Sequence, residues 1–339
     1  MAQRHPIQIG VIGTGGMGGR HARNLAHAVT GAQVVAVMDV DQKRAQHVAA
    51  ECGAAHIFSD ARALIAHPEV DAVVIASPDR FHAELTLASL AAGKPVFCEK
   101  PLATSVADAK RVIEAERAGE RRLVQVGFMR EYDPAHQQVK AVVERGDIGA
   151  PLLFRGLHTN WEEGAAPTID EVIINSAIHD IHSTRWLMGQ EIATAYVRYI
   201  PANPQQPETC RLVVMELTLA NGALAVIECN INSGYGYEVA VEIAGTHGTV
   251  RTDGFRNPLV RRNFQVEQAI EPDWLVRFDT AYVAEMQNWV QALYHSDAVG
   301  PNAWDGYASL VVAEACIQAA YSGQPQAVSL PERPAFYRR

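Results

Sequence analysis

Residues 7–18 read IQIGVIGTGGMG, and this stretch decides the fold of the first part of the chain. The apolar run that opens it stops at glycines, which is typical of a buried strand leading into a tight turn. Gly13, Gly15 and Gly18 then fill a G-x-G-x-x-G pattern. Such glycines make the turn, let the backbone approach a pyrophosphate, and allow the following helix to pack on the strand. The stretch therefore predicts a dinucleotide-binding strand–turn–helix unit.

Asp39 is the second feature of this unit. It ends the next predicted strand, 21 residues after Gly18. A carboxylate at that place accepts hydrogen bonds from the adenosine ribose and repels a 2′-phosphate. Met38 and Val40 beside it offer no arginine for that phosphate, so the sequence favours NAD over NADP. The alternative is a glycine-rich turn without a ligand, but the strand, glycines, helix and acidic residue of the pattern occur here together. No Gly-Lys-Ser/Thr follows, which excludes a P-loop.

Strand and helix patterns organise the chain into two parts. Up to about residue 127, apolar runs alternate with helical patterns, which predicts an α/β fold with a doubly wound parallel sheet of the Rossmann type. Beyond it, β-rich runs predict a second domain with an antiparallel or mixed sheet, with hairpin turns at Asn221-Gly222 and His247-Gly248. Predicted helices in this part cover residues 173–188, 279–296 and 303–322. We therefore expect one domain over 1–127 and a second over 128–339.

The composition excludes several classes of protein. The 339 residues are 48% hydrophobic and 20% charged, with a net charge of −9 and no basic block, so a nucleic-acid surface is not expected. No apolar run approaches the length of a membrane span, and the N-terminus lacks the apolar core of a signal peptide, which favours a cytoplasmic protein. The five cysteines are scattered without a CxxC pair, and they predict reduced thiols rather than disulfides or structural zinc.

Lys100 stands in FCEKPLAT, residues 97–104, at the end of a predicted strand. The carboxyl ends of the strands line the ligand crevice of a doubly wound sheet, so this lysine is placed where chemistry occurs. Pro101 restricts it to an extended backbone, and a cis peptide bond between the two is a further possibility. A surface lysine in a strand-end turn explains the same residues equally well when they are taken alone.

A second polar group lies in the predicted helix over 173–188. Asn175, His179, His182 and Trp186 are spaced at i, i+4, i+7 and i+11, which puts them on one face of an α-helix. Taken alone, such a stripe is more typical of a structural histidine than of a proton acceptor. His179 and His182 could also bind a metal, but no third ligand stands at a recognisable spacing, so no metal site is predicted.

Motifs along nearly the whole chain resemble the Gfo/Idh/MocA oxidoreductases. They are GVIGTGGMG, AVMDVD, VFCEKPLAT, RLVQVGFMREYD, IGAPLL, HTN, IHDIH, YGYEVAVEIAGTHG, AWDGY and the closing PERPAFY. The Glu-Lys-Pro motif is highly specific to this family, whereas VGFMREYD and the closing stretch indicate its inositol dehydrogenase branch. The resemblance implies an N-terminal Rossmann domain and a C-terminal α/β domain with an open, largely antiparallel sheet. By the same resemblance, the second domain is used for oligomerisation, often as a homotetramer. The resemblance also implies hydride transfer between NAD and a ring hydroxyl of a cyclic polyol, an inositol or related sugar.

The resemblance assigns residues position by position. Lys100 matches the lysine that contacts the reacting oxygen, and His179 matches the catalytic histidine, with Asn175 four residues before it. The expected cofactor-binding residues are Gly13, Gly15, Gly16, Met17, Gly18, Asp39, Ser77, Pro78, His82, Glu99 and Lys100. The expected substrate-binding residues are Lys100, Met129, Arg130, His158, Asn160, Asn175, His179 and Tyr235.

Two positions depart from the family pattern. The family usually has aspartate where this chain has Asn175, and many relatives have aspartate in place of His182. An asparagine still accepts a hydrogen bond, but it stabilises an imidazolium less than a carboxylate does. Three alternatives stay open: a glycosidase of the same superfamily that uses NAD without net redox, a reductase of a keto-sugar, and a dinucleotide-sensing regulator without catalysis. The joint presence of Lys100 and His179 disfavours the regulator.

Overall fold

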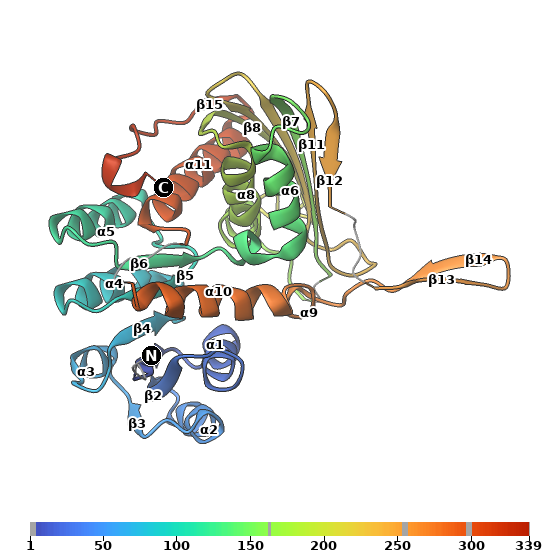
Figure 1. Ribbon diagram of the computed structural model, residues 1–339. Helices are drawn as coiled ribbons and strands as arrows, with labels where there is room; N and C mark the ends of the chain where they lie inside the picture. The colour runs from blue at the N-terminus through green and yellow to red at the C-terminus, as the bar shows by residue number, and fades with distance from the viewer. Residues whose placement is uncertain (1–4, 162–163, 253–256, 296–299, 339) are drawn as a thin grey trace. The chain divides into compact units, whose positions relative to one another are not determined.

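The computed structural model describes residues 5–161, 164–252, 257–295 and 300–338 and divides into two compact units (Figure 1). The first unit comprises Met1–Met129, Thr280–Leu310 and Glu332–Arg339, and the second comprises Arg130–Asp279 and Val311–Pro331. This division differs from the expected domains in the C-terminal part of the chain, where two segments belong to the first unit. The physical reason is packing, because Met286, Trp289 and Val290 lie in one buried cluster with Phe97.

The first unit contains six parallel strands in the order β3-β2-β1-β4-β5-β6, as the alternating pattern predicts. The strands are β1 (Ile7–Ile12), β2 (Ala32–Met38), β3 (His56–Phe58), β4 (Ala72–Ile75), β5 (Val96–Glu99) and β6 (Val124–Gly127). The strand order reverses at β1 and β4. In doubly wound sheets, ligands bind at such a reversal, beside the carboxyl ends of the strands. The turns that follow β1 and β4 therefore stand at the expected ligand-binding edge.

Helices cover both faces of this sheet. They are α1 (Gly16–His27), α2 (Gln42–Cys52), α3 (Ala61–Ala66), α4 (His82–Ala91), α5 (Val106–Ala118) and α10 (Asp279–Leu293). Helices α1 and α2 lie on one side, and α3, α4 and α5 lie on the other (Figure 1). Leu25, Val48 and Trp289 place α10 in one buried cluster with α1 and α2. Ser105 caps α5 as predicted, because its Oγ accepts a hydrogen bond from Asp108 N at 3.1 Å.

The second unit contains a seven-stranded sheet in the order β12-β11-β7-β10-β9-β8-β15. Strands β7 and β10 pair in parallel, and the other neighbours pair antiparallel. The strands are β7 (Pro151–Thr159), β8 (Ile192–Ile200), β9 (Leu212–Leu219), β10 (Leu224–Asn230), β11 (Glu238–Gly245), β12 (Thr249–Arg251) and β15 (Gln326–Ala327). The predicted turns at 221–222 and 247–248 are confirmed, since they join β9 to β10 and β11 to β12.

Helices cover one face of this second sheet. The helical elements are α6 (Pro134–Glu144), α7 (Ile169–Glu171), the π-helix η3 (Val172–Ala177), α8 (Ile178–Met188), α9 (Trp274–Arg277) and α11 (Ala303–Ser322). Val139 of α6, Ile181 of α8 and Ala319 of α11 join the buried cluster of the sheet, and these three helices lie on the same side of it (Figure 1). Val214 and Val226 point to the opposite face and are exposed, so that face is open.

Several elements differ from the sequence prediction. The expected helix over 173–188 is divided, because its first part is the π-helix η3 and α8 begins at Ile178. Helix α10 ends at Leu293, and residue 296, the predicted end, lies outside the described residues. Short elements carry too few residues for a periodic pattern. The sequence therefore missed β3, α3, α9, β15 and the hairpin of β13 (Leu259–Arg262) and β14 (Gln265–Gln268).

The five cysteines are free thiols, as the sequence predicts. Within the parts of the chain that the structure describes, no helix combines the length and the apolar character needed to cross a membrane.

Candidate functional site

The glycine turn after β1 places the N-terminus of α1 beside open space. Gly13 has a φ of +84°, and a Cβ at this position would lie 2.5 Å from Ala76 O. Gly18 packs against the same turn, because its Cβ would come within 1.7 Å of Gly13 O. Gly15 and Gly16 have no atom within 4 Å of such a Cβ. The chain thus has the tight turn, the close helix–strand packing and the open backbone at Gly15 and Gly16 that a pyrophosphate needs at a helix N-terminus.

Asp39 follows β2 and is held by a dense set of hydrogen bonds. Its Oδ2 accepts from Thr14 N at 2.8 Å and from Thr14 Oγ1 at 2.9 Å. Its Oδ1 accepts from Asp41 N at 2.9 Å. Burial raises the pKa of Asp39, but hydrogen bonds from Arg44, Asp41 and Thr14 outweigh burial and hold this pKa well below its usual range. The carboxylate is therefore ionised at neutral pH, as an acceptor for ribose hydroxyls must be.

Arg44 is a charged neighbour of Asp39 that the sequence reasoning missed. Its Nε donates to Asp39 Oδ2 at 3.1 Å, and its Nη2 donates to Asp39 Oδ1 at 2.9 Å. The residues that flank Asp39 in the chain, Met38 and Val40, carry no positive charge. Asp41, however, caps α2 and places Arg44 in the first turn of that helix, close to the strand end. An arginine therefore does stand at this site, five residues beyond the carboxylate.

His82, the first residue of α4, connects two loops at the carboxyl edge of the sheet. Its Nδ1 lies 2.7 Å from Pro101 O and its Nε2 lies 2.8 Å from Ser77 O. Both partners are carbonyl oxygens, which only accept, so both ring nitrogens must donate. That condition is met by the imidazolium form. Burial lowers the pKa of His82, but the neighbouring Cys98 and the two carbonyls raise it to about 10 in net.

We expect the stabilising contribution of the His82 charge to the free energy of unfolding to disappear at alkaline pH. The folded-state pKa is raised from 6.5 to about 10, so the contribution of His82 is complete below pH 6.5 and is lost as the pH rises through about 10. Denaturant unfolding of the wild type and of His82→Gln, measured from pH 6.5 to 10, should give a difference in unfolding free energy that shrinks with rising pH. Parallel curves for the two proteins would contradict the imidazolium assignment.

Lys100 directly follows β5, at the start of the loop that His82 contacts through Pro101 O. The Lys100–Pro101 peptide bond is cis, as the sequence allowed. The backbone N–H of Lys100 donates to Glu99 Oε2 at 3.2 Å. Glu99 Oε1 lies 2.7 Å from His21 Nε2. Burial raises the pKa of Glu99, but the hydrogen bond to His21 and the charges of Lys100 and His82 lower it in net. An ionised Glu99 thus fixes the turn that carries Lys100, as expected for a supporting residue.

Asn175 and His179 lie in the second unit, on different kinds of helix. Asn175 stands in the π-helix η3 and is exposed, whereas His179 stands in the first turn of α8 and is 8% exposed. The stripe expected for a single α-helix is therefore not the geometry observed. A π turn holds more residues than an α turn, and such turns are frequent at functional sites.

Asp180, next to His179, is the centre of a buried ion network that the sequence did not reveal. It is 0% exposed. Arg130 Nη1 donates to Asp180 Oδ1 at 2.5 Å, and His158 Nδ1 lies 2.7 Å from Asp180 Oδ2. Tyr237 Oη lies 3.4 Å from the other nitrogen of His158. Burial raises the pKa of Asp180, but Arg130 and His158 lower it to about 2 in net. Through Asp180, this network joins α8 to His158 of β7 and to Arg130 at the start of the second unit.

Arg130 and His158 were expected to bind the substrate. The structure places both in this network, with exposed fractions of 1% and 3%. Both side chains contact Asp180, so they hold the first turn of α8 in place. A direct contact with a substrate stays a prediction for both side chains.

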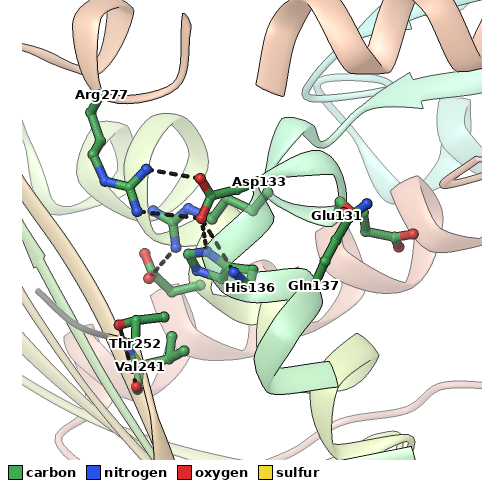
Figure 2. Close-up of polar contacts among 9 residues, drawn as sticks. Glu131, Asp133, His136, Gln137, Val241, Thr252 and Arg277 are labelled. Carbon is green, nitrogen blue, oxygen red and sulfur yellow. Dashed lines mark hydrogen bonds and ion pairs between the residues drawn. The ribbon is translucent and has the colours of Figure 1, made fainter. Parts of the chain in front are cut away.

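The segment that carries Arg130 is fixed by a second set of polar contacts (Figure 2). Asp133 caps α6 and lies 2.6 Å from His136 Nδ1, and it also accepts from Arg277 Nη1 at 2.9 Å. Gln137 Nε2 donates to the backbone oxygen of Glu131 at 3.0 Å. These contacts tie the stretch after β6 to α6 and α9, so the backbone around Arg130 has little freedom.

Glu131 also explains the second departure from the family pattern. His182 Nε2 lies 2.9 Å from Glu131 Oε1, and both side chains are at least nine-tenths buried. A carboxylate therefore does stand beside position 182, although another part of the chain supplies it. His182 is thus a buried hydrogen-bond partner of that carboxylate.

The other expected substrate residues are dispersed over their units. Met129, which ends the first segment of the first unit, is 2% exposed. Asn160 follows β7, and its backbone N–H donates to Asn230 O at 2.8 Å. Tyr235 is 45% exposed, and its Oη donates to Glu238 Oε2 at 2.9 Å.

The predicted site residues thus form two groups. The first unit holds the predicted cofactor residues, which are the glycine turn, Asp39, Ser77, Pro78, His82, Glu99 and Lys100. The second unit holds the predicted substrate residues Arg130, His158, Asn160, Asn175, His179 and Tyr235. The first group can bind a dinucleotide, and the second offers an imidazole and polar groups for a substrate. Among the described residues, no group of three or more His, Cys, Asp or Glu side chains is arranged to hold a metal ion.

Comparison with known proteins places both units in one family. A model of the oxidoreductase family's NAD-binding Rossmann fold matches residues 7–128. A model of the C-terminal alpha/beta domain of the same oxidoreductase family matches residues 140–330. The two matches together cover most of the chain.

Individual relatives agree with this. The chain is 52% identical to the inositol 2-dehydrogenase of Rubrobacter xylanophilus, over 98% of this chain and 96% of the relative. It is 43% identical to inositol 2-dehydrogenase 2 of Saccharopolyspora erythraea, over 98% of both chains. Among solved structures, it resembles myo-inositol dehydrogenase from Lactobacillus casei in complex with NAD(H) and myo-inositol. The TM-score is 0.93 and the identity is 31%, over 98% of this chain and all of that one.

Proposed function

Because this chain belongs to the Gfo/Idh/MocA oxidoreductase family, we propose that it oxidises a ring hydroxyl of an inositol, or of a related cyclic polyol, by hydride transfer to NAD. The observation that carries this proposal is the 52% identity to an inositol 2-dehydrogenase along nearly the full length of both chains. The glycine turn and the ionised Asp39 support NAD as the cofactor, because they match the pyrophosphate and the ribose of that dinucleotide.

NAD, when bound, supplies the acceptor for the hydride. We assign the dinucleotide to Gly13, Gly15, Gly16, Met17 and Gly18, with Asp39 on the ribose and Ser77, Pro78 and His82 at the neighbouring strand end. His82 would act by holding the Ser77 and Pro101 carbonyls, and Glu99 by fixing the Lys100 turn.

The proton chemistry belongs to Lys100 and His179. His179 takes the proton of the reacting hydroxyl, for which an imidazole suits because its ordinary pKa lies near neutrality. Lys100, as a cation, stabilises the negative charge that develops on the same oxygen. Lys100 stands in the first unit and His179 in the second, and their meeting over one nicotinamide ring is part of the proposal. Asn175 would orient the substrate or the imidazole through its amide.

The open face of the second sheet supports the proposed homotetramer. Val214, Leu224 and Val226 are exposed on strands β9 and β10. Exposed apolar side chains on an uncovered sheet face can pack against another copy of the chain. We place the enzyme in the cytoplasm, in keeping with its reduced cysteines.

A substrate panel tests the proposed activity. The chain is incubated with NAD and with single inositol isomers, aldohexoses or glycosides, and NADH is followed by its near-ultraviolet absorbance. We expect NADH formation with at least one inositol, with kcat/KM higher for NAD than for NADP. Polyols tested without the enzyme are the control. Cleavage of a glycoside without net NADH would favour the glycosidase alternative and contradict the dehydrogenase. The myo- and scyllo- isomers are the first to compare, because scyllo-inositol dehydrogenase from Lactobacillus casei has a TM-score of 0.88 to this chain, at 25% identity.

A further inference from the structure

The Asp39 carboxylate is surrounded by more hydrogen-bond donors than it has lone-pair sites. Five donors point to it: Thr14 N, Thr14 Oγ1 and Arg44 Nε on Oδ2, and Asp41 N and Arg44 Nη2 on Oδ1. A carboxylate offers about four lone-pair sites on its two oxygens. All of them are therefore taken in this geometry, and no acceptor site is left for a ribose hydroxyl.

The five donors differ in how easily they can leave. Thr14 is 2% exposed, and two of the donors are backbone N–H groups whose positions the chain fixes. The Arg44 side chain is 46% exposed and has rotatable bonds that carry its guanidinium into solvent. An exposed ion pair of this kind contributes little to stability, so releasing it costs little. Arg44 is thus the donor that a ribose hydroxyl can displace.

We propose that Arg44 sets the cofactor selectivity of this protein by competing with the ribose for Asp39. A dinucleotide that hydrogen-bonds Asp39 must take the acceptor sites that Arg44 holds, and the displaced guanidinium then lies beside the 2′ position. There it is a ready partner for a 2′-phosphate, because arginine binds phosphate through parallel hydrogen bonds. Arg44 therefore weakens NAD binding, strengthens NADP binding, and makes the discrimination between them smaller than Asp39 alone would produce.

This inference rests on the proposed place of the adenosine ribose at Asp39, and dinucleotide binding tests it without any polyol. Calorimetric titration with NAD and with NADP gives the Kd values of the wild type, Arg44→Ala, and the matched control Lys43→Ala. Lys43 is an exposed cation on the neighbouring position of α2. We expect Arg44→Ala to lower the Kd for NAD about threefold or more and to raise the Kd for NADP about tenfold, whereas Lys43→Ala changes both much less.

A second pair of variants separates the repulsion of the 2′-phosphate by Asp39 from its attraction by Arg44. Asp39→Ala should gain NADP affinity, and Asp39→Ala/Arg44→Ala should lose most of that gain, because the cation that receives the phosphate is missing. Added salt should reduce the gain as well, since the contact is exposed and ionic. Equal Kd values in the wild type and Arg44→Ala would overturn the inference alone. A wild type that binds neither dinucleotide would overturn the proposed function with it.

Discussion

Lys100→Ala and His179→Ala are each expected to lower kcat with the preferred polyol by about 10²–10⁴-fold, the usual effect of removing a positioned acid–base or charge-stabilising group. The physical reason is that, in the proposed mechanism, both groups act on the same oxygen. His179 is proposed to remove its proton, and the Lys100 ammonium to stabilise the charge left behind. Steady-state kinetics with NAD measures the effect, together with calorimetric NAD binding.

The Kd for NAD should change little in either variant, because the dinucleotide contacts are proposed to come mainly from the glycine turn and Asp39. Lys110→Ala is the matched control, since Lys110 is a lysine on the surface of α5 with a side chain 64% exposed. It should leave kcat unchanged. Turnover close to that of the wild type in Lys100→Ala or His179→Ala would remove that residue from the proposed chemistry.

The sequence was a good guide wherever local chemistry decides the structure. A glycine turn needs positive φ, close packing and open space within six residues, so Gly13, Gly15 and Gly18 could be recognised from their spacing alone. Hairpin turns and the Ser105 cap are equally local, and the structure confirms them. Alternating strands and helices predicted the parallel sheet for the same reason.

The parts that the sequence could not provide depend on residues far apart in the chain. Asp180 and Arg130 are 50 positions apart, and nothing in the letters IHDIH shows that the aspartate is buried against an arginine. The pair of His182 with Glu131 is separated by 51 positions. The π-helix around Asn175 also has no sequence signature, because its residues are ordinary helix residues. Arg44 was missed for another reason: its distance to Asp39 depends on the first turn of α2.

Asp180→Ala is expected to destabilise the protein by about 3–5 kcal/mol, the usual cost of leaving the partner of a buried ion pair without its counter-ion. The wild-type pair is 1% and 0% exposed, so neither charge can turn to water. The folded-state pKa of Asp180 is lowered from 3.8 to about 2, so its contribution is complete above pH 3.8 and is lost as the pH falls through about 2. Denaturant unfolding at neutral pH, followed by fluorescence, measures the loss.

Two further variants decide whether the uncompensated charge is the cause of that loss. Glu242→Ala breaks an ion pair in which the side chain of Arg155 is 53% exposed and that of Glu242 is 32% exposed. It should lower the free energy of unfolding by at most about 1 kcal/mol. Asp180→Leu/Arg130→Met replaces both buried charges by apolar side chains of similar volume, and it should recover much of the stability lost in Asp180→Ala. A double variant as unstable as Asp180→Ala would show that the shape of this network, rather than its charge balance, holds α8 in place. In that case, His179 would owe its position to the hydrogen-bond geometry around Asp180 rather than to charge compensation.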